Sequence, residues 1–443
     1  MRPLLIVTVV FSIACPSLHA QATSSPANSQ VAPPQESGAA LSLPQAEAIA
    51  LKNNPQITVG RLRALAAEQY VREARSALMP NAYLSLTAVD ANPGSRIAAG
   101  FLNNPILFPR AAEGVSVNQL VTDFGRTTNL LSSSEFGAKA EDQNAAATRA
   151  DILLVVDQAF YNSLETKALV TVAEETVRTR QTLVDKIRAL TNAKLKSEID
   201  LSFSNVDLAR GKLLLLEARN NYQASLAALS AILGYPDEQN FQLVEETAPL
   251  DQPVPDVAPL IQQALQQRPE IKALQFEAES ARKFGSAEHD LWRPTVNALG
   301  VVGQAPVRDN HIPNWYGAVG VNINIPLFNG FLYNARAKAA DLETEADRQR
   351  LLDARNNIAR DVRNAWQDSR RAYERLSVTQ QLREQASLSL DLAQARYNLG
   401  LGSIVEFTQA ELQKTEADIQ DTDAKYQYRL TQIVLAFTIA APK

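Results

Sequence analysis

The chain repeats itself over about two hundred residues, and this duplication constrains its fold more than any other feature. The segment at 50–57 reads ALKNNPQI and corresponds to ALQQRPEI at 264–271, 214 positions later. Leu195-Lys196-Ser197 likewise corresponds to Leu401-Gly402-Ser403, 206 positions later. Because the order is kept and the spacing shifts by only a few residues, the chain contains two copies of one long unit, and a short solenoid period is excluded.

Both units are predicted to contain the same elements in the same order. A helix ended by a proline comes first, two alternating segments follow, and a long helical tract closes the unit. A proline near the start of each opening helix, Pro55 or Pro269, predicts a kink or a short preceding turn. The predicted units are 41–250 and 251–443, their opening helices 44–79 and 257–293, and their long tracts 126–233 and 333–439.

The alternating segments predict β-strands with two different faces. In 317–326, Val319, Val321, Ile323 and Ile325 alternate with small or polar residues, and 81–90 alternates in the same way with Leu84 and Leu86 on its apolar face. The segments 111–121 and 295–304 follow the two-residue period less cleanly. Strands of about ten residues with this alternation are typical of outer-membrane barrels. Four strands of an ordinary β-sandwich fit the alternation as well.

The long tracts favour the first alternative. The tract from Arg126 to Asn192 contains no proline, and at about 1.5 Å per residue it is long enough for roughly 100 Å of helix. Helices of this length, rich in Ala, Leu, Gln, Arg and Glu, are typical of coiled coils or helical-barrel walls. Each tract is interrupted once, at 193–197 and at 398–403, and helical sequence resumes afterwards. We therefore expect each interruption to be the tip of a long helical hairpin.

The first forty residues are expected to lie outside this architecture. Residues 1–20 have a charged start, an apolar core and a small residue at the end, which is the pattern of a secretory signal peptide cleaved before Gln21. Ser12 and Pro16 make a poor lipoprotein box around Cys15, so ordinary cleavage is favoured over lipidation. Residues 21–40, rich in Ser, Pro, Gln and Ala, predict a flexible lead-in.

Composition argues against several classes of function. The net charge of −5 does not favour a nucleic-acid partner, which would require a basic face. The single cysteine, Cys15, precedes the predicted cleavage point, and His289 and His311 have no metal-binding spacing. No phosphate-binding loop, nucleophile elbow or plausible catalytic triad is present. The sequence therefore predicts neither an enzyme nor a cofactor.

A chain with four membrane strands cannot complete a pore alone. Four strands do not close a barrel with an interior, and an open sheet edge in lipid leaves backbone groups unpaired at several kcal/mol each. We therefore expect copies to associate until the sheet closes, although the periodicity itself excludes only the monomer.

Three segments resemble the TolC-type outer-membrane efflux proteins. Two of them lie at strand-to-helix junctions, and the third includes the second hairpin tip. They are NQLVTDFGR at 118–126, IPLFNG at 325–330 and ARYNLGLGSIVEF at 395–407. Together with the duplicated strand–helix unit, the resemblance extends over about residues 41–440.

This resemblance implies an α+β membrane protein that works as a passive duct. Three chains of four strands each would form a twelve-stranded barrel in outer-membrane lipid, continued by a long helical barrel in the periplasm. The tip of the helical barrel would be gated and would engage a periplasmic adaptor protein. An inner-membrane pump of the RND, ABC or MFS type would supply the energy for efflux or secretion. The alternative is a structural periplasmic coiled-coil protein with a small β head.

The resemblance also assigns residues at the tip. Glu406 falls where an aperture-lining aspartate sits, and Gln409 falls where a second aspartate would, so that the second ring would be neutral. Asp200 and Tyr397 match a pair that joins neighbouring helices across the closed tip, and a hydrogen bond between them would act as a latch. The remaining tip residues are expected to form the turns. These are Lys196, Ser197, Gly400, Gly402 and Ser403.

Each tip assignment has a simpler structural alternative. Glu406 could be a solvated charge near a helix start, whereas three such carboxylates around a narrow opening would favour cations. Asp200 and Tyr397 could be an ordinary acid near a helix start and an aromatic residue packed in a hairpin. Gly400 and Gly402 are expected mainly to let the backbone turn.

Overall fold

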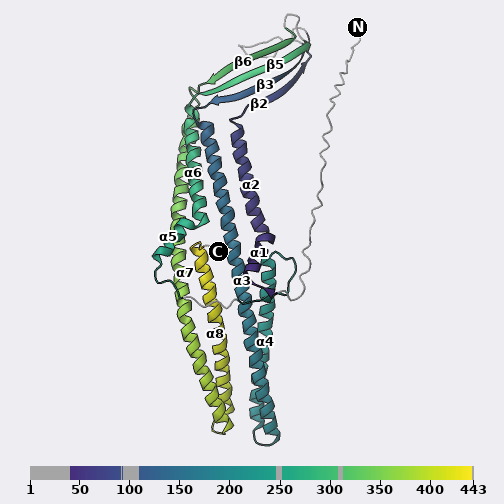
Figure 1. The fold of residues 1–443 in the computed structure, drawn as a ribbon, viewed down its shortest axis with the longest axis vertical. Coiled ribbons are helices and arrows are strands. Elements are labelled where there is room, and N and C mark those ends of the chain that lie inside the picture. Colours follow the sequence, from purple (N-terminus) through teal and green to yellow (C-terminus); the bar gives the residue numbers. More distant parts are fainter. Residues whose placement is uncertain (1–39, 91, 93–108, 246–251, 308–312, 442–443) are drawn as a thin grey trace, which may run out of the picture.

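The protein is a long helical rod with a β-sheet at one end and two helical hairpin tips at the other (Figure 1). The computed structural model describes residues 40–90, 92, 109–245, 252–307 and 313–441. The predicted signal peptide and nearly all of the predicted lead-in lie outside the described residues. The described C-terminal end lies about halfway along the rod, because the last helix is much shorter than its hairpin partner.

Each repeat opens with a helix that a proline divides in two. The residue before each proline, Asn54 or Arg268, is extended, with ψ angles of 122° and 128°, because the proline ring disfavours a helical residue before it. The Asn54 side chain accepts a hydrogen bond from the Gln56 N–H at 2.9 Å and so caps the second piece. The predicted kinks are confirmed. The pieces are α1 (Leu43–Asn53) and α2 (Pro55–Ser76), then α5 (Ala258–Gln267) and α6 (Pro269–His289).

The long helical tracts are also confirmed. In each repeat a helix of 67 residues runs the length of the rod and a helix of 35 residues returns beside it. They are α3 (Arg126–Asn192) with α4 (Glu198–Ile232), and α7 (Leu332–Asn398) with α8 (Ile404–Thr438). The two hairpins pack side by side through α3 and α8, which leaves α4 and α7 on the outer sides. We call the α3–α8 contact region the seam.

Three apolar clusters hold the helices together. Two lie halfway along the rod, where α1 and the short parallel pair β1 (Ala40–Leu41) and β4 (Gln242–Leu243) pack on the first hairpin and α5 packs on the second. The third, the tip core, joins the two hairpins at their ends. Its buried members are Ile187, Ala393, Tyr397, Ile404, Phe407 and Ala410. No described helix combines the length and apolar composition that crossing a bilayer would require.

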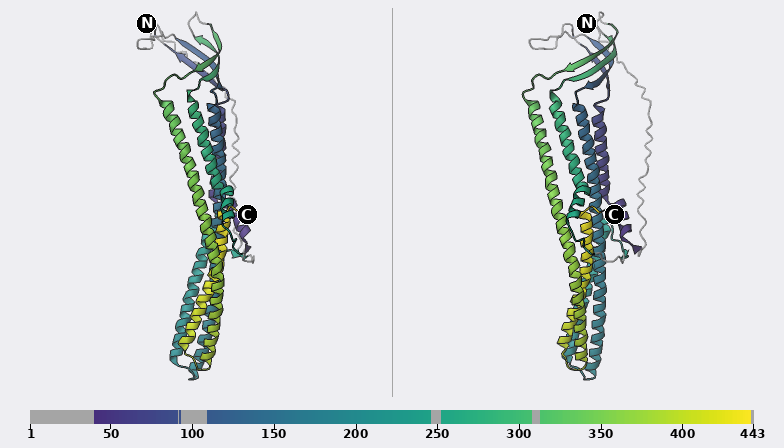
Figure 2. Two further views of the ribbon diagram at one scale, coloured as in Figure 1. Left: turned by 90° about the vertical axis from the view of Figure 1, so that its left-hand side faces the viewer. Right: turned by 60° about the vertical axis from the view of Figure 1, so that its left-hand side comes forward.

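The sheet contains two strands from each repeat. Its order is β2-β3-β5-β6, every neighbouring pair is antiparallel, and the central β3–β5 pair joins the repeats. Each strand is connected to one long helix, and these helices lie side by side beneath the sheet in the order α2, α3, α6 and α7 (Figure 2). A short 3-10 turn, η1 (Asp290–Trp292), separates α6 from β5. The strands are β2 (Asn81–Val89), β3 (Arg110–Thr122), β5 (Thr295–Val307) and β6 (Trp315–Asn324).

The strand register gives the sheet one apolar face and one small or polar face. Leu84 lies opposite Val115, Val115 lies opposite Val302, and on the next pair Val319 lies opposite Gly300. The apolar alternation of separate segments therefore adds up to one continuous surface, and Val319 is 92% exposed on it. Among the described residues no second sheet covers this surface, so the sandwich alternative is not supported.

Candidate functional site at the helical tip

Both hairpins turn by the same local motif at the tip. The turn residue of the first hairpin, Lys194, and that of the second, Gly400, adopt left-handed backbones with φ of 60° and 75°. In each turn the next residue, Leu195 or Leu401, donates its N–H to the carbonyl five residues back, at 2.9 and 2.8 Å. This bond satisfies a helix-end carbonyl, as in the Schellman motif. Gly400 therefore lies at a position where the left-handed backbone favours glycine.

The returning helices begin with equivalent caps. Ser197 Oγ accepts a hydrogen bond from the Asp200 N–H at 3.2 Å, and Ser403 Oγ accepts one from the Glu406 N–H at 3.1 Å. Both serines therefore act as N-caps, within the turns where they were predicted. Asp200 and Glu406 occupy the same position in the first turn of α4 and α8, where a carboxylate interacts favourably with the helix dipole.

Tyr397 is a packing residue of the tip core. Its ring stacks on Phe407 with centroids 5.7 Å apart and planes 7° apart, and Lys196 Nζ lies 3.8 Å from its centroid. The side chain is buried, and the Oη atom has no hydrogen-bond partner. Burial, together with the charge of Asp200, raises the pKa of Tyr397 to about 12.

The expected hydrogen bond between Asp200 and Tyr397 is not formed within this chain. Asp200 is close enough for its charge to act on the phenol, but its carboxylate turns back toward the Ser197 N–H, 3.5 Å away. The two residues thus meet at the tip without the bond that a latch would require, and a latching role for the pair remains a prediction.

Glu406 pairs within its own chain. Its Oε1 atom lies 3.2 Å from Arg396 Nε, across the second tip turn, and both side chains are about half exposed. Gln409, one helical turn further along α8, is exposed. An aperture formed by these residues would need further copies of the chain, so both assignments remain predictions.

Gly402 lies within the second tip turn, where its N–H donates to the Arg396 carbonyl at 3.2 Å. Its φ lies outside the left-handed region, so its backbone conformation does not require glycine. A Cβ atom at this position would lie 3.2 Å from both Arg396 Cβ and Glu406 Oε2. Glycine is therefore favoured because it lets the Arg396–Glu406 pair close over the turn.

The sequence interpretation missed the charged residues buried along the seam. Arg180 on α3 lies 3.0 Å from Asp207 on α4, and both are almost fully buried beside Glu411 of α8. Glu411 follows Ile404 and Phe407 at helical spacing, so it occupies a position where an apolar residue is expected. A charge at such a position was the signal that would have indicated this cluster.

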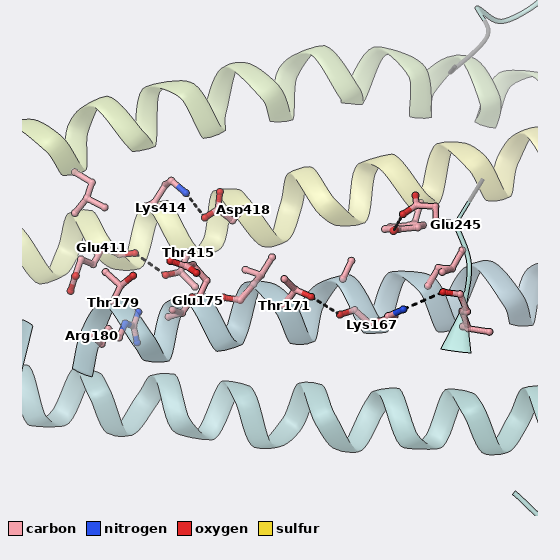
Figure 3. A pocket seen from close by; sticks show the side chains of 17 residues that line it. Lys167, Thr171, Glu175, Thr179, Arg180, Glu245, Glu411, Lys414, Thr415 and Asp418 are labelled. Atoms are coloured by element: carbon pink, nitrogen blue, oxygen red, sulfur yellow. Dashed lines mark hydrogen bonds and ion pairs between the residues drawn. The ribbon is translucent and has the colours of Figure 1, made fainter. Parts of the chain in front are cut away.

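A cavity of about 750 Å³ lies above this cluster, between α3 and α8 (Figure 3). Arg180 and Glu411 lie at one end of it, while Lys167 and Glu245 lie at the other. Most charged groups along its walls are already paired, for example Lys414 with Asp418. Among the described residues no cluster of His, Cys, Asp or Glu is suited to a metal ion.

Comparison with known proteins identifies the family. A sequence profile described as outer membrane efflux protein matches residues 48–235 and 260–441, one match for each repeat. The chain belongs to the outer membrane efflux protein family. Members of this family are outer-membrane channels of efflux and secretion systems and have no enzymatic activity, so the predictions of an outer-membrane location and a channel function are confirmed.

Individual relatives agree with this assignment. The outer membrane protein TolC of Vibrio cholerae is 24% identical over 409 residues, which cover 87% of each chain. The crystal structure of CusC matches with a TM-score of 0.79 at 17% identity, covering 90% of this chain and 91% of that one. The CmeC outer membrane channel of Campylobacter jejuni matches with a TM-score of 0.76 at 17% identity, covering 90% and 85% of the two chains. At these identities the structural matches confirm the predicted fold, with long helices, a four-stranded sheet and two repeats.

Proposed function

We propose that this outer membrane efflux protein works as a homotrimer whose twelve pooled strands form one barrel in outer-membrane lipid. The observation that carries the proposal is the sheet itself, which has a continuous apolar face and two unpaired edges, β2 and β6. An apolar face of this kind suits contact with lipid, but unpaired edges in lipid do not. Joining β6 of one copy to β2 of the next would remove every edge.

The helical rod supports the same assembly. Exposed apolar side chains occur along α4 and α7, the two helices that lie at the sides of the lower half of the rod. On α4 they recur every three to seven residues, as in coiled-coil contacts. Packing α4 of one copy against α7 of the next would bury both rows. Examples are Ile199, Phe203, Val206 and Leu213 on α4, and Val378, Leu382 and Leu392 on α7.

The tip would then be the gated end of a passive duct in the periplasm. Three copies of Glu406 would surround the opening and favour cations, and three copies of Gln409 would form a neutral ring beyond them. Packing in the tip core would hold the hairpins closed, because Tyr397 of the second hairpin lies against Lys196 of the first, with Asp200 at the start of α4 nearby. A periplasmic adaptor would engage this end, and an inner-membrane pump of the RND, ABC or MFS type would supply the energy.

Membrane extraction and mass measurement test the assembly. We expect the protein to require detergent for extraction, to have the mass of a trimer in detergent, and to form pores in planar bilayers. The alternative, a structural periplasmic coiled-coil protein, predicts extraction without detergent and no pores. A monomer that is soluble without detergent would refute the proposal.

Two matched substitutions test the orientation of the sheet. Val319 lies on the apolar face, and Ser85 lies on the opposite face. An aspartate in lipid is costly, whereas one in a water-filled lumen is not. Val319→Asp should therefore reduce the trimer recovered from the outer membrane severalfold, while Ser85→Asp should leave it unchanged. Equal recovery of the two variants would contradict lipid contact at Val319.

A further inference from the structure

Two clusters along the seam each combine one arginine with two carboxyl groups, one of which is a buried glutamate. The Arg180 cluster consists of Arg180, Asp207 and Glu411, and the Arg375 cluster consists of Arg375, Asp423 and Glu165. In the first cluster all three side chains are buried, whereas in the second the arginine and the aspartate are 44% and 30% exposed. From the residue spacing along α3 and α8, the clusters lie roughly 20 Å apart along the rod. Both are distinct from the tip residues discussed above.

The two clusters are built reciprocally across the seam. In the Arg180 cluster the Arg180–Asp207 ion pair, 3.0 Å long, lies within the first hairpin, and the second hairpin contributes Glu411. In the Arg375 cluster the ion pair with Asp423, 2.6 Å long, lies within the second hairpin. There the first hairpin contributes Glu165. Each hairpin thus places one glutamate beside an ion pair whose two partners both belong to the other hairpin.

Charge counting shows that each cluster needs a proton to be neutral. One guanidinium balances one carboxylate, so the inserted glutamate would leave an uncompensated negative charge in the seam. Only 5% of Glu411 and 9% of Glu165 is exposed, so water does little to offset that charge. A protonated glutamate avoids the excess charge and can donate a hydrogen bond to the neighbouring aspartate.

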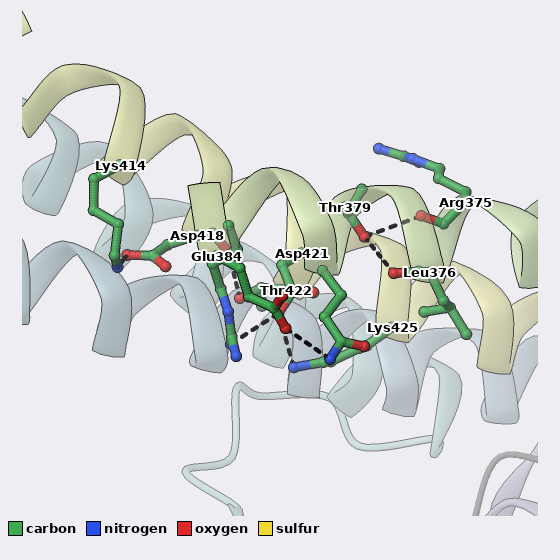
Figure 4. A network of polar contacts seen from close by, with 11 residues as sticks. Arg375, Leu376, Thr379, Glu384, Lys414, Asp418, Asp421, Thr422 and Lys425 are labelled. Atoms are coloured by element: carbon green, nitrogen blue, oxygen red, sulfur yellow. Dashed lines mark hydrogen bonds and ion pairs between the residues drawn. The ribbon is translucent and has the colours of Figure 1, made fainter. Parts of the chain in front are cut away.

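Asp421 provides a contrast on the same helix. This buried carboxylate is shared between Arg383 at 3.0 Å and Lys425 at 2.9 Å, within the network shown in Figure 4. Two cations therefore surround one carboxylate, and no proton is required. Asp421 and Glu411, both buried on α8, therefore differ: Asp421 has two cations for one carboxylate, whereas Glu411 lies beside one arginine and a second carboxylate.

The surrounding charged groups do not remove this shortage. Near Glu411 the other groups are Arg210 on α4 and the Lys414–Asp418 pair on α8, in which Lys414 is already engaged. Near Glu165 they are Tyr426, which donates a hydrogen bond to Glu245 at 3.1 Å, and Arg429 beside Tyr426. The charge of Arg210 acts on Asp207, while among the described residues Arg180 is the cation that acts on Glu411 and Arg375 is the one that acts on Glu165.

We propose that these two clusters form a proton-dependent clasp between the hairpins, closed when Glu165 and Glu411 carry protons and loosened when they lose them. The inference goes beyond the proposed duct, because it assigns control of the hairpin contact to groups along the seam instead of the tip. It builds on the proposed function only in treating separation of the hairpins as the opening movement.

The pKa shifts give the direction of the effect. Burial, followed by the charge of Asp207, raises the pKa of Glu411 to about 7, and burial with a bond to Asp423 raises the pKa of Glu165 to about 7. In a separated seam both groups would face water and return to their ordinary pKa. The closed seam therefore binds protons more tightly, so its stabilisation is present at acidic pH and is lost as pH rises through about 7. Between pH 5.5 and 8 the closed-to-open ratio should fall about tenfold or more per cluster.

Distance measurement across the seam tests the clasp in the full-length channel. Ala189 on α3 and Ala395 on α7 are exposed near the two tips and can carry spin labels after replacement by cysteine. The only natural cysteine, Cys15, lies in the predicted signal peptide. We expect the label distances to lengthen and broaden at pH 8 relative to pH 5.5. Distances that do not change with pH would overturn the clasp.

Substitutions then assign the effect to the clusters. Glu165→Gln with Glu411→Gln mimics the protonated state and should keep the short distances at both pH values. The second double variant, Asp207→Asn with Asp423→Asn, leaves one carboxylate for each arginine and should also abolish the pH dependence. It serves as an independent test in case the first double variant folds poorly. Glu416→Gln, at an exposed position on α8, should respond like the natural protein.

Two outcomes separate the clasp from the proposed function. If the glutamine variant keeps the natural pH response and still forms trimeric pores, the clasp is refuted and the duct stands. If none of the proteins forms pores in planar bilayers, the duct is refuted, while the distances still report whether the seam responds to protons.

Discussion

Removing the hydroxyl of Tyr397 separates two explanations of how the tip stays closed. If a hydrogen bond to Asp200 latches the tip, Tyr397→Phe should loosen it. If the ring holds the hairpins by packing, the same change should do no harm, because the phenylalanine keeps the stack on Phe407 and the contact with Lys196. The structure favours packing, since the Oη atom is buried without a partner.

The expected magnitude follows from the burial of this side chain. A hydroxyl buried without a hydrogen bond costs about 1–3 kcal/mol, so its removal should leave the free energy of tip opening unchanged or raise it by about 1 kcal/mol. Tyr397→Ala, in contrast, removes the ring and should cost about 3–5 kcal/mol. Because the pKa of Tyr397 is raised to about 12, the phenol stays neutral, and the difference between tyrosine and phenylalanine should not vary with pH below about pH 10.

Native-state hydrogen exchange at the end of α7 and conductance in planar bilayers measure these effects. Tyr426 offers a matched control, because its buried hydroxyl donates to Glu245 at 3.1 Å. Tyr426→Phe removes this existing hydrogen bond and should lower the local stability by about 1–2 kcal/mol. If Tyr397→Phe lowered protection as much as the control and also raised conductance, the hydroxyl would be bonded in the assembled tip, and packing alone would not explain closure.

Two further predictions concern the tip turns and the aperture. Lys194→Gly should stabilise the first turn by about 1 kcal/mol, because a left-handed backbone is unfavourable for residues other than glycine. Thermal unfolding measures this change in stability, and Gly400→Ala should shift it in the opposite direction. A loss of stability in Lys194→Gly would contradict the turn assignment. Glu406→Gln should reduce the cation preference and cation block of the pore severalfold in bilayer recordings, and unchanged selectivity would show that Glu406 does not line the constriction.

The sequence alone determined the features that depend on local or periodic patterns. The duplication, the long helices, their hairpin tips and the alternating strands all follow from spacing along a short stretch of chain. The serine caps and the turn at Gly400 were predictable for the same reason, because a cap or a turn involves residues only a few positions apart. Family membership strengthened these predictions without changing them.

The tertiary structure decided what depends on residues far apart in the chain. Tyr397 meets Lys196 from the other hairpin, and Glu411 meets Arg180, only because α3 and α8 pack together. Charge balance in a buried site depends on every helix around it, so no single segment reveals that Glu165 lacks a compensating cation. Gly402 shows the same limit on a smaller scale, since its importance comes from the Arg396–Glu406 pair that closes over it and not from its own backbone.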